Sequence, residues 1–277
     1  MSRELRVIKA DGEEETFDPS KLEASLARAG ASSAARAHII AHMMKALEPA
    51  PLTTSEIYRR AFELLKKREG APVAARYSIK RAIFDLGPSG YPFEQFFAEV
   101  MRSHGWQARH SVILTGRCVT HEVDVLAKKG GKRIGIEAKF HNTPGIKTDV
   151  KDALYVRARY QDLAEATDPD DHVDQGWLVT NTRFTEDAIR YGECAGLPMI
   201  SWDYPRRGNL LELIEEGQVH PLTALTTLSP SEKQRLLDSR IVLCRAVGGS
   251  SQLLREHGVK PQRIPEIQDE ARKLCGA

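Results

Sequence analysis

The sequence has no long apolar run, no strong net charge and no cluster of cysteines. Its apolar stretches stay well below the ~20 residues that a membrane-spanning helix requires, so we expect no membrane partner. Residues 1–4 carry charge and no apolar stretch follows them, which argues against a signal peptide. The net charge is only +2 over 277 residues. Overall charge therefore does not indicate a nucleic-acid partner, although a local basic surface could still bind one.

The four cysteines are far apart in the sequence, at Cys118, Cys194, Cys244 and Cys275, and form no CxxC pair. That spacing argues against a structural zinc site and against a disulfide framework. Unpaired cysteines fit a reducing compartment, so we expect a cytoplasmic protein.

The composition is that of a soluble globular protein. Hydrophobic residues make up 41% of the chain and charged residues 28%, as in packed soluble domains. A length of 277 residues favours two or three domains. Changes in pattern predict three, over residues 1–90, 91–221 and 222–277. The first boundary is the run Gly87-Pro88-Ser89-Gly90, which breaks helices and strands alike.

The first segment is predicted to be a small hairpin followed by four helices. Two short strands are expected within residues 5–17 around the turn Asp11-Gly12. Asp18 and Pro19 then supply an N-cap and a proline at the first helical position. Thr53 and Glu56 have the spacing of a capping box at a later helix start. We expect helices over about 19–30, 34–47, 54–70 and 72–87.

The second segment alternates helices and strands. The expected elements are a helix at 92–104, strands near 108–114, 121–127 and 134–140, a helix at 147–164, a strand at 176–180, a helix at 185–194 and a strand at 198–202. The order αβββαβαβ predicts an α/β (α+β) fold in which helices cover a mixed sheet. The third segment is expected to be helical, with starts at Ser229-Pro230 and Pro265.

Two neighbouring strands of the second segment carry charged side chains. In the run 134–140 the apolar residues alternate with Glu137 and Lys139, so these two side chains share one strand face. In the strand before it, Asp124 opposes an apolar face. The pair Gly130-Gly131 between the strands is typical of a two-residue hairpin turn. In that register Asp124 faces Glu137.

Facing carboxylates predict a divalent-metal site. Two carboxylates directly opposite each other on a sheet repel, and carboxylate oxygens are the ligands that Mg²⁺ prefers. A metal held by Asp124 and Glu137 could polarise a phosphoryl oxygen and lower the pKa of a bound water, while Lys139 orients that water or stabilises charge on phosphorus. A simpler interpretation is an ion pair on a solvated hairpin, since triplets such as Asp149-Val150-Lys151 arise by chance.

These strand residues belong to a longer pattern. Phe93-Glu94 is followed after ten residues by Gly105-Trp106, and Gly176–Asn181 forms a later apolar strand. Residues 91–205 thereby resemble the restriction-endonuclease-like, PD-(D/E)xK fold, nearest to Mrr-like type IV restriction enzymes. The resemblance implies a nuclease with Asp124, Glu137 and Lys139 at the D…ExK positions and Glu94 as a third carboxylate of the site.

The approach to Asp124 departs from this family. Thr115–His121 replaces a Gly-rich acidic stretch, so a preference for modified DNA does not carry over. His141 is a further candidate ligand or phosphate contact, although a lone histidine is more often a surface residue.

The front segment also matches a known pattern, at Lys9, Glu15, Asp18, Lys21 and Thr54, with Tyr77 further on. Over about 3–90 it resembles the ATP-cone of ribonucleotide reductases and of their repressor. The resemblance implies binding of ATP or dATP, with the lysines at the phosphates, Thr54 donating a hydroxyl, and Asp18 or Glu15 accepting from base or ribose. Ala10 stands where the family often has a second basic residue, which leaves the nucleotide open. A domain that has lost its ligand is the alternative.

The last segment resembles helix-hairpin-helix DNA-binding units only vaguely, with Gly248-Gly249 as the one candidate hairpin. A plain helical packing domain is an equal alternative.

The residues and the two resemblances together imply a metal-dependent endodeoxyribonuclease. We expect Mg²⁺-dependent hydrolysis of DNA phosphodiester bonds by a homo-oligomer that ATP or dATP regulates. No GxxxxGK[ST] motif occurs, so we expect no ATP hydrolysis by the front segment. Two alternatives stay open. One is a nucleotide-responsive DNA-binding regulator with an inactive nuclease core, and the other is a junction-resolving or RNA-cleaving enzyme.

Overall fold

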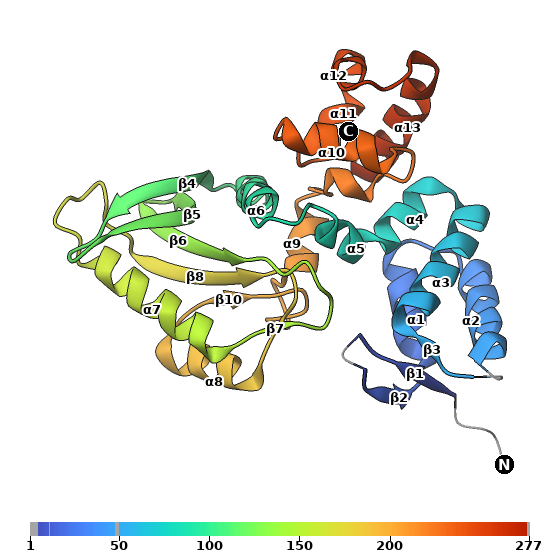
Figure 1. Cartoon of the computed structure of the whole chain (residues 1–277), viewed down its shortest axis with the longest axis horizontal. Coiled ribbons are helices and arrows are strands. Elements are labelled where there is room, and N and C mark those ends of the chain that lie inside the picture. Colours follow the sequence, from blue (N-terminus) through green and yellow to red (C-terminus); the bar gives the residue numbers. More distant parts are fainter. Residues whose placement is uncertain (1–4, 11, 48–49, 276–277) are drawn as a thin grey trace. The chain divides into compact units, whose positions relative to one another are not determined.

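The chain forms two compact units in the computed structural model, which describes residues 5–10, 12–47 and 50–275 (Figure 1). One unit comprises Met1–Ala82, Leu222–Leu236 and Cys244–Ala277, and the other Ile83–Pro221 and Leu237–Leu243. Both mix helices and strands, which confirms the expected α/β (α+β) class. Asp11 of the expected turn and residues 1–4 lie outside the described residues. None of the described helices is long and apolar enough to cross a membrane.

The first unit combines a three-stranded sheet with helices. Its N-terminal elements are β1 (Arg6–Ile8), β2 (Glu14–Thr16), α1 (Pro19–Arg28), α2 (Ser33–Leu47), β3 (Leu52–Thr53), α3 (Thr54–Glu69) and α4 (Ala71–Tyr77), with α5 (Ile79–Phe84) at the unit boundary. The sheet order is β2-β1-β3. Strand β1 pairs antiparallel with β2 and parallel with β3, a strand that sequence patterns did not predict because it is only two residues long.

Local signals set most helix starts of this unit. Asp18 caps α1 by accepting the Ser20 amide, and the capping box of Thr53 and Glu56 at the start of α3 is confirmed. The expectation of one helix over 72–87 is wrong, because the chain breaks at Ser78 between α4 and α5. The Ser78 hydroxyl donates to the Ala75 carbonyl at 2.9 Å, and such a bond competes with the regular helical ladder.

The C-terminal elements of the chain are η1 (Leu222–Ala224), α10 (Pro230–Asp238), α11 (Arg245–Gly248), α12 (Ser251–Glu256), η2 (Pro261–Arg263) and α13 (Ile264–Cys275). A buried carboxylate joins the ends of this region: Glu270, 2% exposed, accepts from the backbone and hydroxyls of Thr226 and Thr227. The Arg76 guanidinium also donates to the Lys273 carbonyl at 2.7 Å. Most of this region therefore belongs to the same compact unit as residues 1–82.

Two cysteines are paired, contrary to expectation. Cys244 and Cys275, 31 residues apart in sequence, form a disulfide. The long separation concealed the pairing, because only the folding of α11 against α13 brings these positions together. Cys118 and Cys194 are free and exposed.

The second unit contains a five-stranded mixed sheet. Its elements are α6 (Tyr91–Ser103), β4 (Gln107–Thr115), β5 (Thr120–Lys129), β6 (Lys132–Lys139), β7 (Lys147–Thr148), α7 (Val150–Ala164), β8 (Gln175–Thr180), β9 (Arg183–Phe184), α8 (Glu186–Ala195), β10 (Met199–Ile200) and α9 (Leu210–Glu216). The strand order is β10-β8-β6-β5-β4. The expected succession of elements is confirmed, with β7, β9 and α9 in addition.

Helices cover both faces of this sheet, with α6 on one side and α7 and α8 on the other (Figure 1). Helix α6 buries Phe93, Phe96 and Phe97 along one face, the spacing of an amphipathic helix. On the other side α7 packs closely, because Gly135 and Gly176 leave room for the Tyr160 ring, where an added Cβ would lie only 2.1–2.2 Å from it. This close packing brings the side chains of α7 onto the strands that carry the charged residues.

Candidate functional site

The hairpin of β5 and β6 has the predicted register. Gly130 and Gly131 take φ values of 59° and 81°, the left-handed conformations that a tight hairpin turn requires. The strands pair from Lys129↔Lys132 to Val125↔Ile136. The next position on β5 is Asp124 and the next on β6 is Glu137, so the two carboxylates follow directly on the last pair.

The ladder of β5 is interrupted at Asp124. Towards β4, one run of pairs ends at His110↔Val125 and the next begins at Val112↔Val123. The residue between them on β4, Ser111, has a φ of 53°, which is rare for a residue other than glycine. Residues held in such sparsely populated backbone conformations cluster at functional sites.

The Asp124 carboxylate is held against the end of β6. Its Oδ2 accepts the backbone N–H of Ala138 at 2.7 Å. Asp124 and Glu137 thus lie one position beyond the last regular pair of the two strands. The Asp124 side chain accepts a hydrogen bond from the backbone of Ala138, the residue after Glu137. Burial raises the pKa of Asp124, while the bond from Ala138 and the nearby Arg159 lower it.

Glu137 shares its carboxylate with a guanidinium from the covering helix. Arg159 of α7 donates to Glu137 Oε2 and to the Glu122 carbonyl at 3.1 Å. The side chains of Arg159 and Glu137 are only 14% and 19% exposed. Burial and then the charge of Asp124 raise the pKa of Glu137 to about 7, despite the opposing effect of Arg159.

Glu94 on the first turn of α6 belongs to the same electrostatic cluster. Burial raises its pKa to about 7, and the carboxylates of Asp124, Glu122 and Glu137 add to the effect. Contact between α6 and the end of β6 is shown by the rings of Phe93 and Phe140, whose centroids are 5.6 Å apart. Glu94 thus lies within the electrostatic influence of Asp124 and Glu137, and its role as a third carboxylate of the site stays a prediction.

Lys139 lies next to these carboxylates along β6, but its ammonium contacts another acid. Its Nζ is 2.9 Å from Oδ1 of Asp152 in the first turn of α7, and the lysine side chain is 44% exposed. The side chain is thus accessible, and its partner holds it at the rim of the site.

His141, two residues further on, is fixed by uncharged groups. Its Nε2 lies 2.9 Å from the Thr148 hydroxyl. The Asn181 amide accepts from its N–H and donates to its carbonyl, both at 2.8 Å. A ligand role for His141 stays a prediction; its observed contacts fix the chain just after Lys139.

The donor set suits a hard divalent cation. Asp124 and Glu137 are half-buried carboxylates with raised pKa values, a situation that a cation between them would relieve, and carboxylate oxygens are the donors that Mg²⁺ prefers. In the described part of the chain, no group of three or more His, Cys, Asp and Glu side chains is already arranged as metal ligands. A metal would therefore take these two carboxylates, and Arg159 would have to yield part of its contact with Glu137.

Two residues of the site were missed from the sequence. Arg159 and Tyr160 lie in the middle of α7, and the Tyr160 hydroxyl is buried without a partner among the described residues. Burial and the charges of Glu137 and Asp124 raise the pKa of Tyr160 well above its usual value. No local motif marks either residue, since their approach to the strands depends on the packing of α7.

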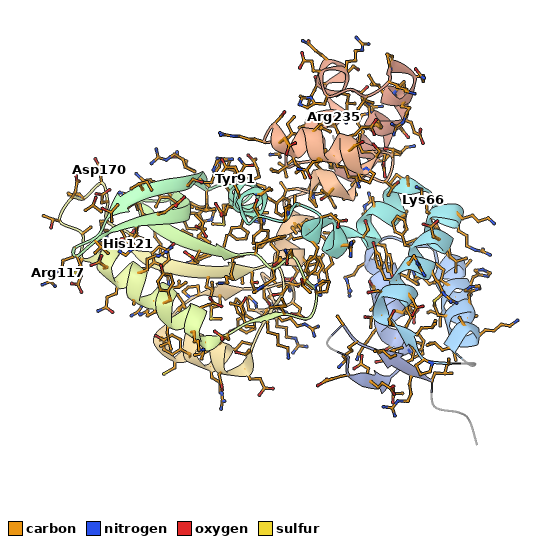
Figure 2. The ribbon with its side chains drawn as sticks, in the orientation of Figure 1. Lys66, Tyr91, Arg117, His121, Asp170 and Arg235 are labelled. Carbon is orange, nitrogen blue, oxygen red and sulfur yellow. A yellow bond between two sulfur atoms is a disulfide. The ribbon has the colours of Figure 1, made fainter. Side chains whose placement is uncertain are left out.

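The stretch Thr115–His121, which differs from the family pattern before Asp124, has a structural role. Asp162 of α7 accepts from the Cys118 amide at 2.8 Å and lies 2.8 Å from Nε2 of His121. These bonds hold the pKa of Asp162 at about 2. Figure 2 shows Arg117 and His121 at the same end of the second unit, where the turn between β4 and β5 is fixed on α7.

The candidate nucleotide residues lie on the small sheet of the first unit and on the helices that follow its strands: Glu15 is in β2, Lys9 follows β1, Lys21 is in α1 and Thr54 is in α3. Glu15 forms ion pairs with Lys9 at 2.9 Å and Lys21 at 3.8 Å. The pairing Ile8↔Thr53 places Lys9 and Thr54 one residue beyond the same parallel pair, and Thr54 begins α3. The start of a helix attracts anions such as phosphate.

Asp18 is the exception among these residues. Its carboxylate accepts from the Ser20 amide and hydroxyl at 2.9 and 2.6 Å, and these bonds lower its pKa. The carboxylate is thus engaged in capping α1, and a role in accepting from base or ribose stays a prediction.

Three segments match known protein families. Residues 5–85 match the ATP cone domain, residues 88–206 match a restriction endonuclease domain of the Mrr type, and residues 220–275 match the AF1548-like C-terminal domain. The first two matches confirm the two resemblances. For this last segment the helix-hairpin-helix unit and the plain helical packing domain both stay predictions; in the structure neither Gly248 nor Gly249 has a positive φ.

A curated relative and a solved structure are each matched over almost their whole length. An uncharacterized protein of Archaeoglobus fulgidus is 34% identical over 180 residues, which cover 65% of this chain and 99% of the relative. The crystal structure of AF1548, a protein of unknown function, matches with 33% identity and a TM-score of 0.57, covering 68% of this chain and 99% of that chain. The MspJI restriction endonuclease in complex with a 27-mer oligonucleotide shows 14% identity and a TM-score of 0.36, over 70% of this chain and 39% of that chain.

Proposed function

The chain belongs to the AF1548-like family, and we propose that it is a Mg²⁺-dependent endonuclease that hydrolyses phosphodiester bonds of DNA. The observation that carries the proposal is the cluster of Glu94, Asp124 and Glu137, with Lys139 at its rim, inside a restriction-endonuclease-like domain. Clustered carboxylates with raised pKa values destabilise a folded protein when they are ionised, and such groups gather at functional sites. A cytoplasmic location stays part of the proposal, although the Cys244–Cys275 disulfide removes the argument from unpaired cysteines.

Each residue has a distinct part in the proposed reaction. Asp124 and Glu137 would hold the metal, which supplies a Lewis acid and a more acidic water. The bond from Ala138 fixes one oxygen of Asp124 and leaves the other oxygen of that carboxylate for the ion. Glu94 adds negative charge from α6.

Lys139 stabilises the phosphate. When a phosphate replaces Asp152 as its partner, the ammonium neutralises the charge that develops on phosphorus in the transition state. The present 2.9 Å contact with Asp152 keeps the ammonium close to Glu137 until the substrate arrives.

We further propose that the first unit binds ATP or dATP and regulates cleavage through self-association. The phosphates would bind to Lys9, to Lys21 and to Thr54, the first residue of α3. They would then compete with Glu15 for the two lysines. A nucleotide regulates only if it binds one state of the protein better than another. Pairing of ATP-cone domains between copies would provide that difference, and this is the reason to expect a homo-oligomer.

One observation favours a second candidate, a nucleotide-responsive DNA-binding regulator with an inactive core. Glu137 and Lys139 are both engaged in ion pairs, with Arg159 and Asp152. If these pairs are permanent, neither residue is available for catalysis.

The test is incubation of the full-length protein with supercoiled, linear, modified and branched DNA, and with RNA. Each substrate is combined with Mg²⁺ or EDTA, with and without ATP or dATP. We expect cleavage of DNA that requires Mg²⁺ and is absent in Glu137→Gln. Binding of DNA without cleavage of any substrate would favour the regulator, and cleavage of RNA or branched DNA alone would redefine the substrate.

A further inference from the structure

We propose that Tyr155 stacks on an unpaired base of the substrate while Arg159 holds the adjoining phosphate, so that the nuclease acts on DNA with single-stranded segments. The inference rests on the nuclease activity proposed above and names its substrate class. Its basis is the position of an exposed aromatic ring directly beside the site carboxylates.

The Tyr155 ring is exposed and yet fixed in place. Its side chain lies on the outer surface of α7 and is 57% exposed. The Arg159 guanidinium lies 4.8 Å from the ring centroid, and Nη2 of Arg159 donates to the Tyr155 hydroxyl at 2.5 Å. Because the guanidinium covers one face of the ring, much of the exposed area belongs to the other face and the edges. A fixed ring with a free face can stack on a base at little entropic cost.

The same guanidinium connects the ring to the proposed metal site. Its other terminal nitrogen, Nη1, donates to Glu137 and to the Glu122 carbonyl. The guanidinium of Arg159 therefore contacts the Tyr155 ring on one side and the Glu137 carboxylate on the other. A phosphate that reaches Glu137 with its metal also reaches Arg159, and guanidinium groups bind phosphate well. The base attached to that phosphate is then within reach of Tyr155.

The surroundings of the ring suit a nucleic-acid strand. Lys151, Tyr155 and Arg159 are four residues apart along α7 and lie along one face of the helix. Ala158, three residues after Tyr155, is exposed and small, which leaves space beside the ring. The acids at the start of the helix have other partners, since Asp149 caps α7 and Asp152 pairs with Lys139.

This combination favours unpaired DNA over duplex. Proteins bind single strands through positive charge along the backbone and aromatic rings on which bases stack. In a duplex the faces of the bases are covered by their neighbours, so a ring gains a partner only at a frayed end, flap or gap. Tyr155 therefore selects substrates in which the base next to the cleaved phosphate is unpaired.

The test is fluorescence anisotropy with a labelled oligonucleotide, as a single strand and as a duplex, using the full-length protein in EDTA. Tyr155→Ala should weaken single-strand binding about 5- to 150-fold, because stacking on an aromatic side chain contributes about 1–3 kcal/mol per base and 1.4 kcal/mol is tenfold. Its effect on duplex binding should be much smaller. Tyr155→Phe keeps the ring and should bind nearly as wild type. The matched control is Leu154→Ala, an adjacent and similarly exposed side chain (47%).

A second readout reports stacking directly. A single strand carrying the fluorescent base 2-aminopurine should change its emission on binding to the wild type and to Tyr155→Phe, and not on binding to Tyr155→Ala. Equal losses for single strand and duplex, or a Tyr155→Ala variant that behaves as Leu154→Ala, would overturn the stacking role even if the protein cleaves DNA. A wild-type protein that binds no oligonucleotide would overturn both this inference and the proposed function.

Discussion

Replacing Glu94 by glutamine should stabilise the metal-free second unit at alkaline pH. The pKa of Glu94 is raised from 4.5 to about 7 by burial and by neighbouring carboxylates. Between these two pH values the folded protein keeps a proton on Glu94 that the unfolded chain has already lost, so stability falls as pH rises through this window. Above pH 7 the full penalty applies. It amounts to about 3 kcal/mol as an upper value, since one pKa unit corresponds to 1.36 kcal/mol.

Glutamine has nearly the same shape and carries no charge, so Glu94→Gln removes the penalty. In EDTA we expect a gain of about 2–3 kcal/mol at pH 8 and less than about 1 kcal/mol at pH 5, where the unfolded chain has lost most of this proton but the penalty is still far from complete. Urea unfolding followed by tryptophan fluorescence is the assay. All three tryptophans, Trp106, Trp177 and Trp202, lie in the second unit, so the signal reports on that unit.

The matched control is Glu99→Gln on the same helix. Glu99 pairs with Arg102, so its replacement should cost about 0.2–0.5 kcal/mol at pH 8, the opposite sign. If Glu94→Gln is no more stable than the wild type at pH 8, or gains equally at pH 5 and pH 8, Glu94 does not face the carboxylates of the site.

Three further predictions concern the rim of the site, the cysteines and the first unit. Lys139→Ala should lose about 100-fold or more of the cleavage rate, as expected for removal of a charge-stabilising group, and should keep its DNA affinity; a wild-type rate would exclude Lys139 from the mechanism. The protein unfolded without reduction should react with a thiol reagent at two positions, Cys118 and Cys194, and at four positions after reduction; four reactive thiols in the unfolded, unreduced protein would disprove the disulfide. Lys9→Ala combined with Lys21→Ala should abolish the effect of ATP or dATP on oligomer mass and on cleavage rate, an effect we expect at about 1–3 kcal/mol of coupling. No calorimetric binding of either nucleotide to the wild type would remove the regulatory role.

The site was predictable where its causes are local. The double glycine at Gly130-Gly131 and the alternation of apolar residues fix the register of β5 and β6, and that register places Asp124 next to Glu137. Helix caps at Asp18 and Thr53 were predictable for the same reason, because each depends on residues within one turn.

The remaining features depend on contacts between distant parts of the chain. Arg159 reaches Glu137 across 22 residues, and Cys244 pairs with Cys275 across 31. The positive φ of Ser111 occurs opposite Asp124 in the pairing of β4 with β5. No local pattern marks these features, since tertiary packing alone brings the partners together.

The most direct test of the account is metal uptake by the proposed site. Mn²⁺ is a spectroscopic substitute for Mg²⁺, and its free concentration can be followed by electron paramagnetic resonance during titration of the full-length protein. Asp124→Asn is the preferred variant, because asparagine keeps an acceptor for the Ala138 N–H, whereas alanine would leave that group unpaired at a cost of about 1–3 kcal/mol. Glu137→Gln is its counterpart on β6. We expect Mn²⁺ binding to the wild type and at least about tenfold weaker binding to each variant, the equivalent of losing about 1.4 kcal/mol. Equal uptake by the wild type and both variants would contradict a metal site at Asp124 and Glu137.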